Sequence, residues 1–523
     1  MRTIDDRPER LFLLFVLVHT FCWTVVPALV NPNLPYDVIE GLAWGHEWQW
    51  GYYKHPPIKP WFLEAMAVVS GRADWAMYLL SQLCVVGAFW AVWRLAREFF
   101  SPAMALVAVL LLEGVYYHNF TSPEFNVNVA QLPFWALTIL FTWWGLTRRT
   151  TLPWVLAGAC IGLGFLSKYV FLFLVMAIVV MLFAVREFRP VLKSPGPWIG
   201  ALVSLAVAAP HLYWFVANDF PTIAYAVEMA DPGKPSLFNH IFYPLRLLVG
   251  QSLILIPVLL MLLTLRRKEG ELPEPVQTST AAGPFLLFTA LGPPLLMALM
   301  SALFGWKIRS MWATPLFLTA SVTLIYFLRE RLTTVRLRGF TIALGLLFSL
   351  SLLAYAGHAF IGPAFTERPK RVHFPGLALA DEVTRRWHDH FEKPPEIIIG
   401  SYWVAGNVAY YAPHRATVFI DADPGKAPWV TPEQMRRHGA VIIGFSRREA
   451  LQMVPFDPER VIDTGPVTLA PEYWKDLKPF EFWMLILPPS DKAGADLGRI
   501  AVDGATDRAA MAEDAVTSAL QRW

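Results

Sequence analysis

Apolar residues dominate the first 360 positions of the chain and fall into long runs separated by short polar segments. A helix that crosses a bilayer needs roughly 20 mostly apolar residues. The pattern predicts about eleven such spans: 11–30, 76–93, 103–118, 129–146, 152–167, 169–185, 198–216, 246–265, 284–304, 310–328 and 339–360. We therefore expect a mostly α fold in which residues 1–360 form a polytopic helical bundle.

The pattern changes after residue 360, where short β-rich runs alternate with polar, helix-compatible stretches such as 379–391. The β-rich runs are 396–400, 417–420, 440–444 and 483–487. This alternation is typical of a small α/β domain. We predict such a domain over 361–490, followed by a polar tail over 491–523.

Basic residues are distributed unevenly between the connections of the predicted spans. Cytoplasmic loops of membrane proteins are enriched in Lys and Arg. If the N-terminus is cytoplasmic, the strongly basic connections between the spans all fall on the cytoplasmic side: 94–97, 148–149, 186–193, 266–268 and 329–338. The sequence thus predicts a cytoplasmic N-terminus and a C-terminal domain on the opposite side.

Composition agrees with lipid as the surrounding medium. Of the 523 residues, 55% are hydrophobic and 16% are charged, whereas soluble domains average about 25% charged residues. The formal net charge of +3 is too small to indicate a nucleic acid as the partner. Membrane lipid is the expected partner, and the candidate functions are those of a membrane enzyme or transporter.

The first outer loop, 31–75, carries two carboxylates beside a Trp-rich stretch. Asp37 and Glu40 are one helical turn apart and could share a face, and 39–50 could form an interfacial helix. A carboxylate beside the bilayer can act as a general base on a sugar hydroxyl. The alternative is a capping box, in which Asp37 begins the helix and Glu40 completes the cap.

Five cationic side chains are predicted near the same side of the membrane. Lys54 and His55 precede two prolines and could bind a phosphate, although such residues often snorkel to the interface. Lys168 interrupts an apolar stretch of about 34 residues, so it must pair, snorkel or meet an anion. Lys307 and Arg309 occupy a short outer turn, against the usual inside bias, which suggests an anionic ligand such as a lipid phosphate.

Further polar residues accompany these cations. Glu124 and Asn126 open a predicted span from the outer side, where they either cap the helix or face a cavity. His211 lies at the outer end of another span and could be a structural, hydrogen-bonded histidine. Together with Tyr53 of the first loop, these residues are the candidates for lining a cavity.

In chain order, several motifs resemble those of GT-C glycosyltransferases, in particular the ArnT/Rgt-like branch of the bacterial protein-mannosyltransferase-like group. The motifs are Tyr36-Asp37 with Glu40, then 51–57 (GYYKHPP), 125–128 (FNVN), 164–169 (GFLSKY), 210–214 (PHLYW) with 218–222 (NDFPT), 307–312 (KIRSMW), and 405–413 (AGNVAYYAP). The resemblance extends from the first loop into the C-terminal domain.

This resemblance implies a GT-C fold and a polyprenyl-phosphate-sugar donor. It implies an acceptor such as lipid A, a core oligosaccharide, another glycan or a protein, at the periplasmic face of the bacterial inner membrane. It also implies that Asp37 is catalytic. Many relatives carry Glu directly after this Asp, whereas here Val38 follows and the second acid is Glu40. Where the aminoarabinose transferases have Glu-Lys before Pro, this chain has Lys54-His55; a divalent metal is possible.

We therefore expect Asp37, with Glu40 beside it, to carry the chemistry and the five cations to hold the donor phosphate. The main alternative is a transporter or flippase of a lipid-linked sugar, which performs no chemistry. Such transporters often show inverted repeats and paired broken helices, and the sequence shows no internal symmetry. A ligase of preassembled glycan is a further alternative, which product analysis would distinguish.

Overall fold

The computed structural model describes residues 7–490 except 232, 235, 272 and 274–278, so the tail predicted over 491–523 lies outside the described residues. The chain forms two compact units. The membrane unit contains the described residues up to Val26, together with Lys54–Lys59 and Tyr78–Tyr355. The α/β unit contains Pro27–Tyr53, Pro60–Met77 and the described residues from Ala356 on.

Seven helices of the described residues are long and apolar enough to cross a membrane. They are α1 (Arg7–Val30), α4 (Asp74–Ala96), α6 and α7 (Val127–Arg148), α10 (Gly196–Ala217), α12 and α13 (Asn239–Leu263), α14 (Ala282–Phe304) and α16 with the turn before it (Thr334–Phe360). An eighth candidate, Ser310–Phe317 with Ala320–Arg331, is bent by 52°. Three further apolar helices are shorter: Pro102–Gly114, Leu152–Ser167 and Tyr169–Ala184.

Each of the eleven predicted apolar runs coincides with one of these helices, and the predicted mostly α membrane bundle is confirmed. The chain is a multi-pass membrane protein. Three of the runs are shorter than a full span because short 3₁₀ segments and extended residues interrupt them. One example is Lys168, whose backbone is extended (φ −164°, ψ 139°) where α8 (Leu152–Ser167) ends.

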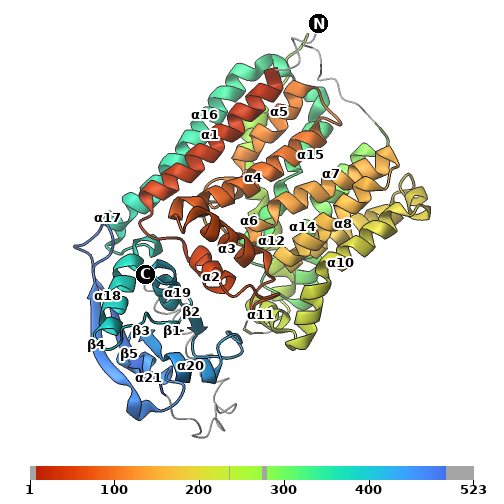
Figure 1. Cartoon of the computed structure of the whole chain (residues 1–523). Coiled ribbons are helices and arrows are strands. Elements are labelled where there is room, and N and C mark those ends of the chain that lie inside the picture. Colours follow the sequence, from red (N-terminus) through yellow and green to blue (C-terminus); the bar gives the residue numbers. More distant parts are fainter. Residues whose placement is uncertain (1–6, 232, 235, 272, 274–278, 491–523) are drawn as a thin grey trace. The chain divides into compact units, whose positions relative to one another are not determined.

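In the membrane unit, glycines allow close contacts between helices, and other helices leave an apolar face exposed. A Cβ atom at Gly158 of α8 would lie 2.9 Å from the Cα of Gly200 on α10, so only glycine allows this approach. Helix α16 runs beside α1 (Figure 1), with ring centroids of Phe348 and His19 6.4 Å apart. Only 6% of the apolar stretch of α16 is buried within the protein, as expected for a helix whose outer face contacts lipid.

The α/β unit contains a five-stranded sheet with the order β2-β1-β3-β5-β4. The strands are β1 (Ile397–Gly400), β2 (Thr417–Ile420), β3 (Ala440–Gly444), β4 (Ile462–Leu469) and β5 (Phe480–Leu487). Strand β1 pairs in parallel with β2 and β3, whereas β5 is antiparallel to β3 and β4. The helices of this unit include α17 (Gly362–Thr366), α18 (Gly376–His388), α19 (Val404–Tyr411), α20 (Pro432–His438) and α21 (Arg447–Gln452). The predicted α/β character is confirmed.

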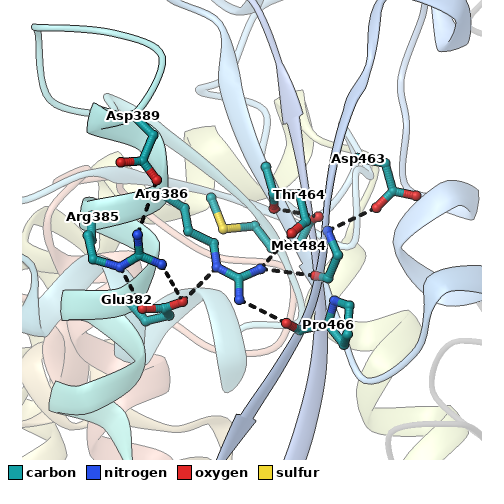
Figure 2. Close-up of polar contacts among 9 residues, drawn as sticks. Glu382, Arg385, Arg386, Asp389, Asp463, Thr464, Pro466 and Met484 are labelled. Carbon is teal, nitrogen blue, oxygen red and sulfur yellow. Dashed lines mark hydrogen bonds and ion pairs between the residues drawn. The ribbon is translucent and has the colours of Figure 1, made fainter.

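Strand β4 is the one strand of this sheet that the sequence pattern did not predict. It lies at the sheet edge, contains Pro466, and has a register shift between Asp463 and Gly465; proline is confined to edges and bulges. Arg386 of α18 donates to the carbonyls of Thr464 and Pro466, each at 2.8 Å (Figure 2). The irregular edge strand is thus held by a helix side chain.

Helix α2 (Tyr36–Gly45) lies in the α/β unit and differs from the interfacial helix predicted over 39–50. It begins three residues earlier and ends before Trp48, whose backbone is left-handed (φ 46°) and cannot continue a helix. Residues 38–45 are buried in protein, because α2 packs on α19 and β2. Trp48 and Trp50 are exposed after the helix ends.

Candidate functional site

Asp37 lies half-buried in the first turn of α2. The N-cap residue is Pro35, with φ −59° and ψ 158°, and no side chain forms a cap hydrogen bond. The alternative of a capping box between Asp37 and Glu40 is therefore wrong, because the helix begins at Tyr36, after a proline that already holds the chain extended. Asp37 occupies a position where the helix dipole favours a carboxylate.

Glu40 is only 3% exposed and lies beside two tyrosines. The hydroxyls of Tyr36 and Tyr402 form a hydrogen bond, and their rings meet edge to face at 5.1 Å. Burial and the Glu40 carboxylate raise the pKa of Tyr402 well above its usual range. Burial also raises the pKa of Tyr36, against the effect of its bond with Tyr402. Both hydroxyls therefore remain protonated at neutral pH. We name Tyr36, Asp37, Glu40 and Tyr402 the α2 cluster.

Sequence reasoning missed Tyr402, which is 366 positions from its partner Tyr36. The available signal was its place three residues before the Ala405-Gly406-Asn407 motif. Tyr53 lies in the same unit, half-buried, with its ring 5.7 Å from that of Trp44. The ammonium of Lys426 lies 5.8 Å from the centroid of the Tyr53 ring. Tyr53 is thus placed among aromatic and cationic side chains.

In the membrane unit, Lys54 and His55 approach one aromatic residue of α11 (Pro221–Ala230). The Lys54 ammonium lies 5.4 Å from the centroid of the Tyr225 ring, and the His55 ring meets it edge to face at 5.9 Å. Lys54 is 8% exposed, whereas a snorkelling lysine would extend its head into water. The snorkelling alternative for Lys54 is therefore not what the structure shows.

Lys168 is also buried, at 7% exposure, so it does not snorkel either. Its ammonium donates to the side-chain oxygen of Asn128 at 2.6 Å and lies 5.3 Å from the ring of Trp312. The neighbouring Tyr169 hydroxyl bonds to both His211 and Thr222 at 2.8 Å. His211 is 1% exposed. Its hydrogen bonds through Tyr169 to Thr222 join α10 to α11, which supports the interpretation of His211 as a structural, hydrogen-bonded histidine.

Lys307 and Arg309 are exposed and lie beside the C-terminal end of α11. The backbone N–H of Lys307 donates to the carbonyl of Ala230 at 2.9 Å, and the guanidinium of Arg309 lies 3.1 Å from the sulfur of Met229. All five candidate cations thus adjoin α11, directly or, for Lys168, through Tyr169. We name Lys54, His55, Lys168, Lys307 and Arg309 the α11 cluster.

Asn126 caps the short helix α6 (Val127–Ala130). Its side-chain oxygen accepts from the backbone N–H groups of Asn128 at 2.9 Å and Val129 at 3.2 Å. The capping alternative holds for this residue, and the cap presents Asn128 to Lys168. Glu124 is half-buried just before the cap.

Sequence reasoning also missed a buried polar network within the membrane unit. His19 of α1 lies 2.5 Å from the Glu113 carboxylate and 3.1 Å from the Gln82 side-chain oxygen, and Gln82 donates to Ser122 at 3.1 Å. His19 and Glu113 are at most 1% exposed. The signal was His19 within one apolar run and Glu113 within another, since ionisable groups in such runs must find partners.

No group of three or more His, Cys, Asp or Glu side chains that could hold a metal ion occurs among the residues that the structure describes.

The chain is similar to several known proteins. The family model "Dolichyl-phosphate-mannose-protein mannosyltransferase" matches residues 54–214. The lipid A galacturonosyltransferase RgtD of Rhizobium johnstonii is 29% identical over 223 residues, which span 42% of this chain and 46% of RgtD. The lipopolysaccharide core galacturonosyltransferase RgtA of the same organism is 22% identical over 456 residues, which span 85% of this chain and 89% of RgtA. The match to RgtD thus spans less than half of that protein.

A solved structure shares the fold. ArnT from Cupriavidus metallidurans, bound to undecaprenyl phosphate, superposes with a TM-score of 0.59 at 14% identity over 93% of this chain and 99% of ArnT. The resemblance to the ArnT/Rgt-like branch of GT-C glycosyltransferases is confirmed by these matches, and the fold is that of ArnT.

Proposed function

We propose that the chain is a glycosyltransferase that moves a sugar from a polyprenyl phosphate to a lipid A/LPS-type, glycan or protein acceptor at the periplasmic face of the bacterial inner membrane. The observation that carries this proposal is the α11 cluster. It gathers four cationic side chains and the imidazole of His55 beside one short helix of a membrane-spanning bundle, as a lipid-linked phosphate would require.

The two buried lysines are the strongest part of this argument. An ammonium in a low-dielectric surrounding is stabilised when an anion approaches it. Lys54 lies against Tyr225, and Lys168 lies against Asn128 and Trp312. An arriving phosphate would therefore find donors that are already oriented. Lys307 and Arg309, being exposed, would meet the donor first.

The reaction we propose uses Asp37 as the base. The acceptor hydroxyl attacks the anomeric carbon of the donor while Asp37 takes its proton. The bond between the anomeric carbon and the phosphate oxygen breaks, and polyprenyl phosphate leaves with the electron pair. Cations of the α11 cluster stabilise the charge on the leaving phosphate. Glu40 and the protonated hydroxyls of Tyr36 and Tyr402 form the polar surroundings of Asp37.

The names of the relatives suggest which substrates to test first. RgtD and RgtA are named for galacturonosyl transfer to lipid A and to the lipopolysaccharide core, and ArnT was solved with undecaprenyl phosphate. We therefore propose polyprenyl-phosphate-galacturonic acid as the first donor and lipid A or core oligosaccharide as the first acceptors.

The test combines a purified enzyme with a deletion strain. Protein in nanodiscs is incubated with polyprenyl-phosphate-galacturonic acid and lipid A, and products are identified by mass spectrometry. Lipid A and core from a deletion strain should lack the same sugar. A flippase would instead move the donor across liposomes without forming product. The proposal would be rejected if neither lipid A nor core oligosaccharide gave a product and the surface glycans of the deletion strain were unchanged.

A further inference from the structure

The α/β unit holds α2 at both ends and along one face, and α2 carries Asp37. At the start of α2, the backbone N–H of Asn33 donates to the carbonyl of Val372 at 3.1 Å. The N–H of Leu34 donates to the hydroxyl of Tyr411 at 3.2 Å. The two residues before Pro35 are therefore tied to the C-terminal part of the chain, which fixes where the helix begins.

The first residue of α2 is held by its side chain. Tyr36 bonds to the Tyr402 hydroxyl, lies 5.2 Å from the ring of Trp403, and has the guanidinium of Arg371 4.8 Å from its ring centroid. A ring enclosed in this way allows little rotation of the first helical turn. Asp37 is the next residue in that turn.

The far end of α2 is held by an arginine. Arg415 donates to the carbonyl of Leu42 at 2.8 Å and forms an ion pair with Glu64 at 2.7 Å. Burial raises the pKa of Glu64, but bonds to His46 and Arg415 outweigh it, so the pKa is lowered and the carboxylate stays ionised. The ion pair with Glu64 thus holds Arg415 in place to donate to the carbonyl of Leu42 near the end of α2.

Between these ends, α2 and α19 meet at a glycine. A Cβ atom at Gly406 would lie 2.9 Å from Cγ2 of Ile39 and 3.5 Å from Cβ of Ala43. Figure 1 shows the two helices adjacent, in agreement with their contacts. The obstructing atom is a methyl on a β-branched residue, which cannot move away by rotating the end of a long side chain.

We propose that the α/β unit is part of the catalytic apparatus, in which Gly406 and Tyr402 are positioning residues that set the place of Asp37 through α2. The inference rests on the proposed function for the role of Asp37. It predicts that small changes at Gly406 of α19 and at Tyr402 just before it, made without altering any charge, reduce turnover rather than donor affinity. The reason is that a displacement of about 1 Å can lower a rate about 100-fold.

The decisive variant is Gly406→Ala, with Ile39→Leu as its rescue. Gly406→Ala should lower kcat by about tenfold to 100-fold and leave the KM for donor within about twofold, since the α11 cluster is unchanged. Alanine is the better helix former, so α19 itself should not unfold. Ile39→Leu removes the obstructing methyl at nearly constant volume, and the double variant should regain most of the lost rate.

Two further variants separate positioning from general damage. Tyr402→Phe deletes the hydroxyl that meets Tyr36 and should lower kcat about twofold to tenfold. Gly444→Ala is the matched control, because its Cβ would lie 3.1 Å from the backbone nitrogen of Ala450, against α21 rather than α2. It should keep kcat near the wild-type value.

Hydrogen–deuterium exchange of the α2 peptide provides a readout that does not depend on activity. Exchange there should accelerate in Gly406→Ala, return in the double variant with Ile39→Leu, and stay unchanged in Gly444→Ala. The inference is overturned if Gly406→Ala keeps both kcat and α2 protection, if Ile39→Leu restores neither, or if Gly444→Ala has the same effects. If the wild-type protein forms no product, the proposed function fails, while the exchange measurement still decides whether α19 holds α2.

Discussion

Replacing Asp37 by asparagine separates a chemical role for this residue from a structural one. The substitution keeps the shape of the side chain and removes its charge and its ability to take a proton. The N-cap is Pro35, without a side-chain cap bond, so no cap is lost. The helix loses one favourable charge in its first turn, worth about 0.3–1 kcal/mol.

The loss in rate should be much larger than this loss in stability. A positioned general base contributes about 10²-fold to 10⁴-fold to a rate. We therefore expect kcat of Asp37→Asn to fall at least about 100-fold, while the free energy of unfolding falls by no more than about 1 kcal/mol. Initial rates at saturating donor and thermal unfolding in the same nanodiscs give the two quantities.

Glu40→Gln serves as the companion variant. Glu40 is 3% exposed, and its charge acts on Tyr36 and Tyr402, so its loss should disturb the surroundings of Asp37 and reduce the rate less than Asp37→Asn does. Wild-type turnover in Asp37→Asn would refute the assignment of the base. A fall in activity that only follows a fall in folded protein would refute it as well.

Four other outcomes follow from the described contacts. Lys307→Ala and Arg309→Ala should each raise the KM for donor about tenfold to 100-fold, as expected for a charge-assisted contact of about 1.5–3 kcal/mol; unchanged donor kinetics would reduce both to interface anchors. Lys168→Met should abolish donor binding in a lipid-phosphate binding assay while the protein still inserts and folds, and retained affinity would exclude this lysine from the site. A phosphatase reporter fused after Pro363 should be active and a cytoplasmic reporter inactive; the reverse would disprove the predicted orientation. Burial lowers the pKa of His373 to about 4, so the unfolded state binds a proton at higher pH than the folded state does. Thermal stability should therefore fall as pH decreases from about 6.5 towards 4. His373→Gln should weaken this pH dependence.

The sequence pattern was sufficient for most of the fold. Eleven apolar runs and four of the five strands are found where the periodicity predicts them, because both depend on local composition. Strand β4 was missed because Gly465 and Pro466 interrupt its pattern, and in the structure it is held by pairing with β5 and by Arg386. The division at residues 360 and 490 stays a prediction, as does the orientation in the membrane.

The candidate site was predictable in its residue types but not in its geometry. Whether Lys54 and Lys168 snorkel or are buried depends on Tyr225, Asn128 and Trp312, which are distant in the chain. Local spacing made Asp37 look like a cap, because it could not show that Pro35 occupies that position. The site roles assigned to these residues remain predictions that the experiments above address.

The pair formed by His19 and Glu113 constrains the order in which the protein assembles during synthesis. The two residues are 94 positions apart. At about 5–20 residues per second, Glu113 is synthesised roughly 5 to 20 s after His19. Helix α1 must therefore reach the bilayer with an imidazole that has not yet met its carboxylate, or wait beside the insertion machinery until that carboxylate arrives. Helix α1 thus gains this buried partner only after a further 94 residues have been made.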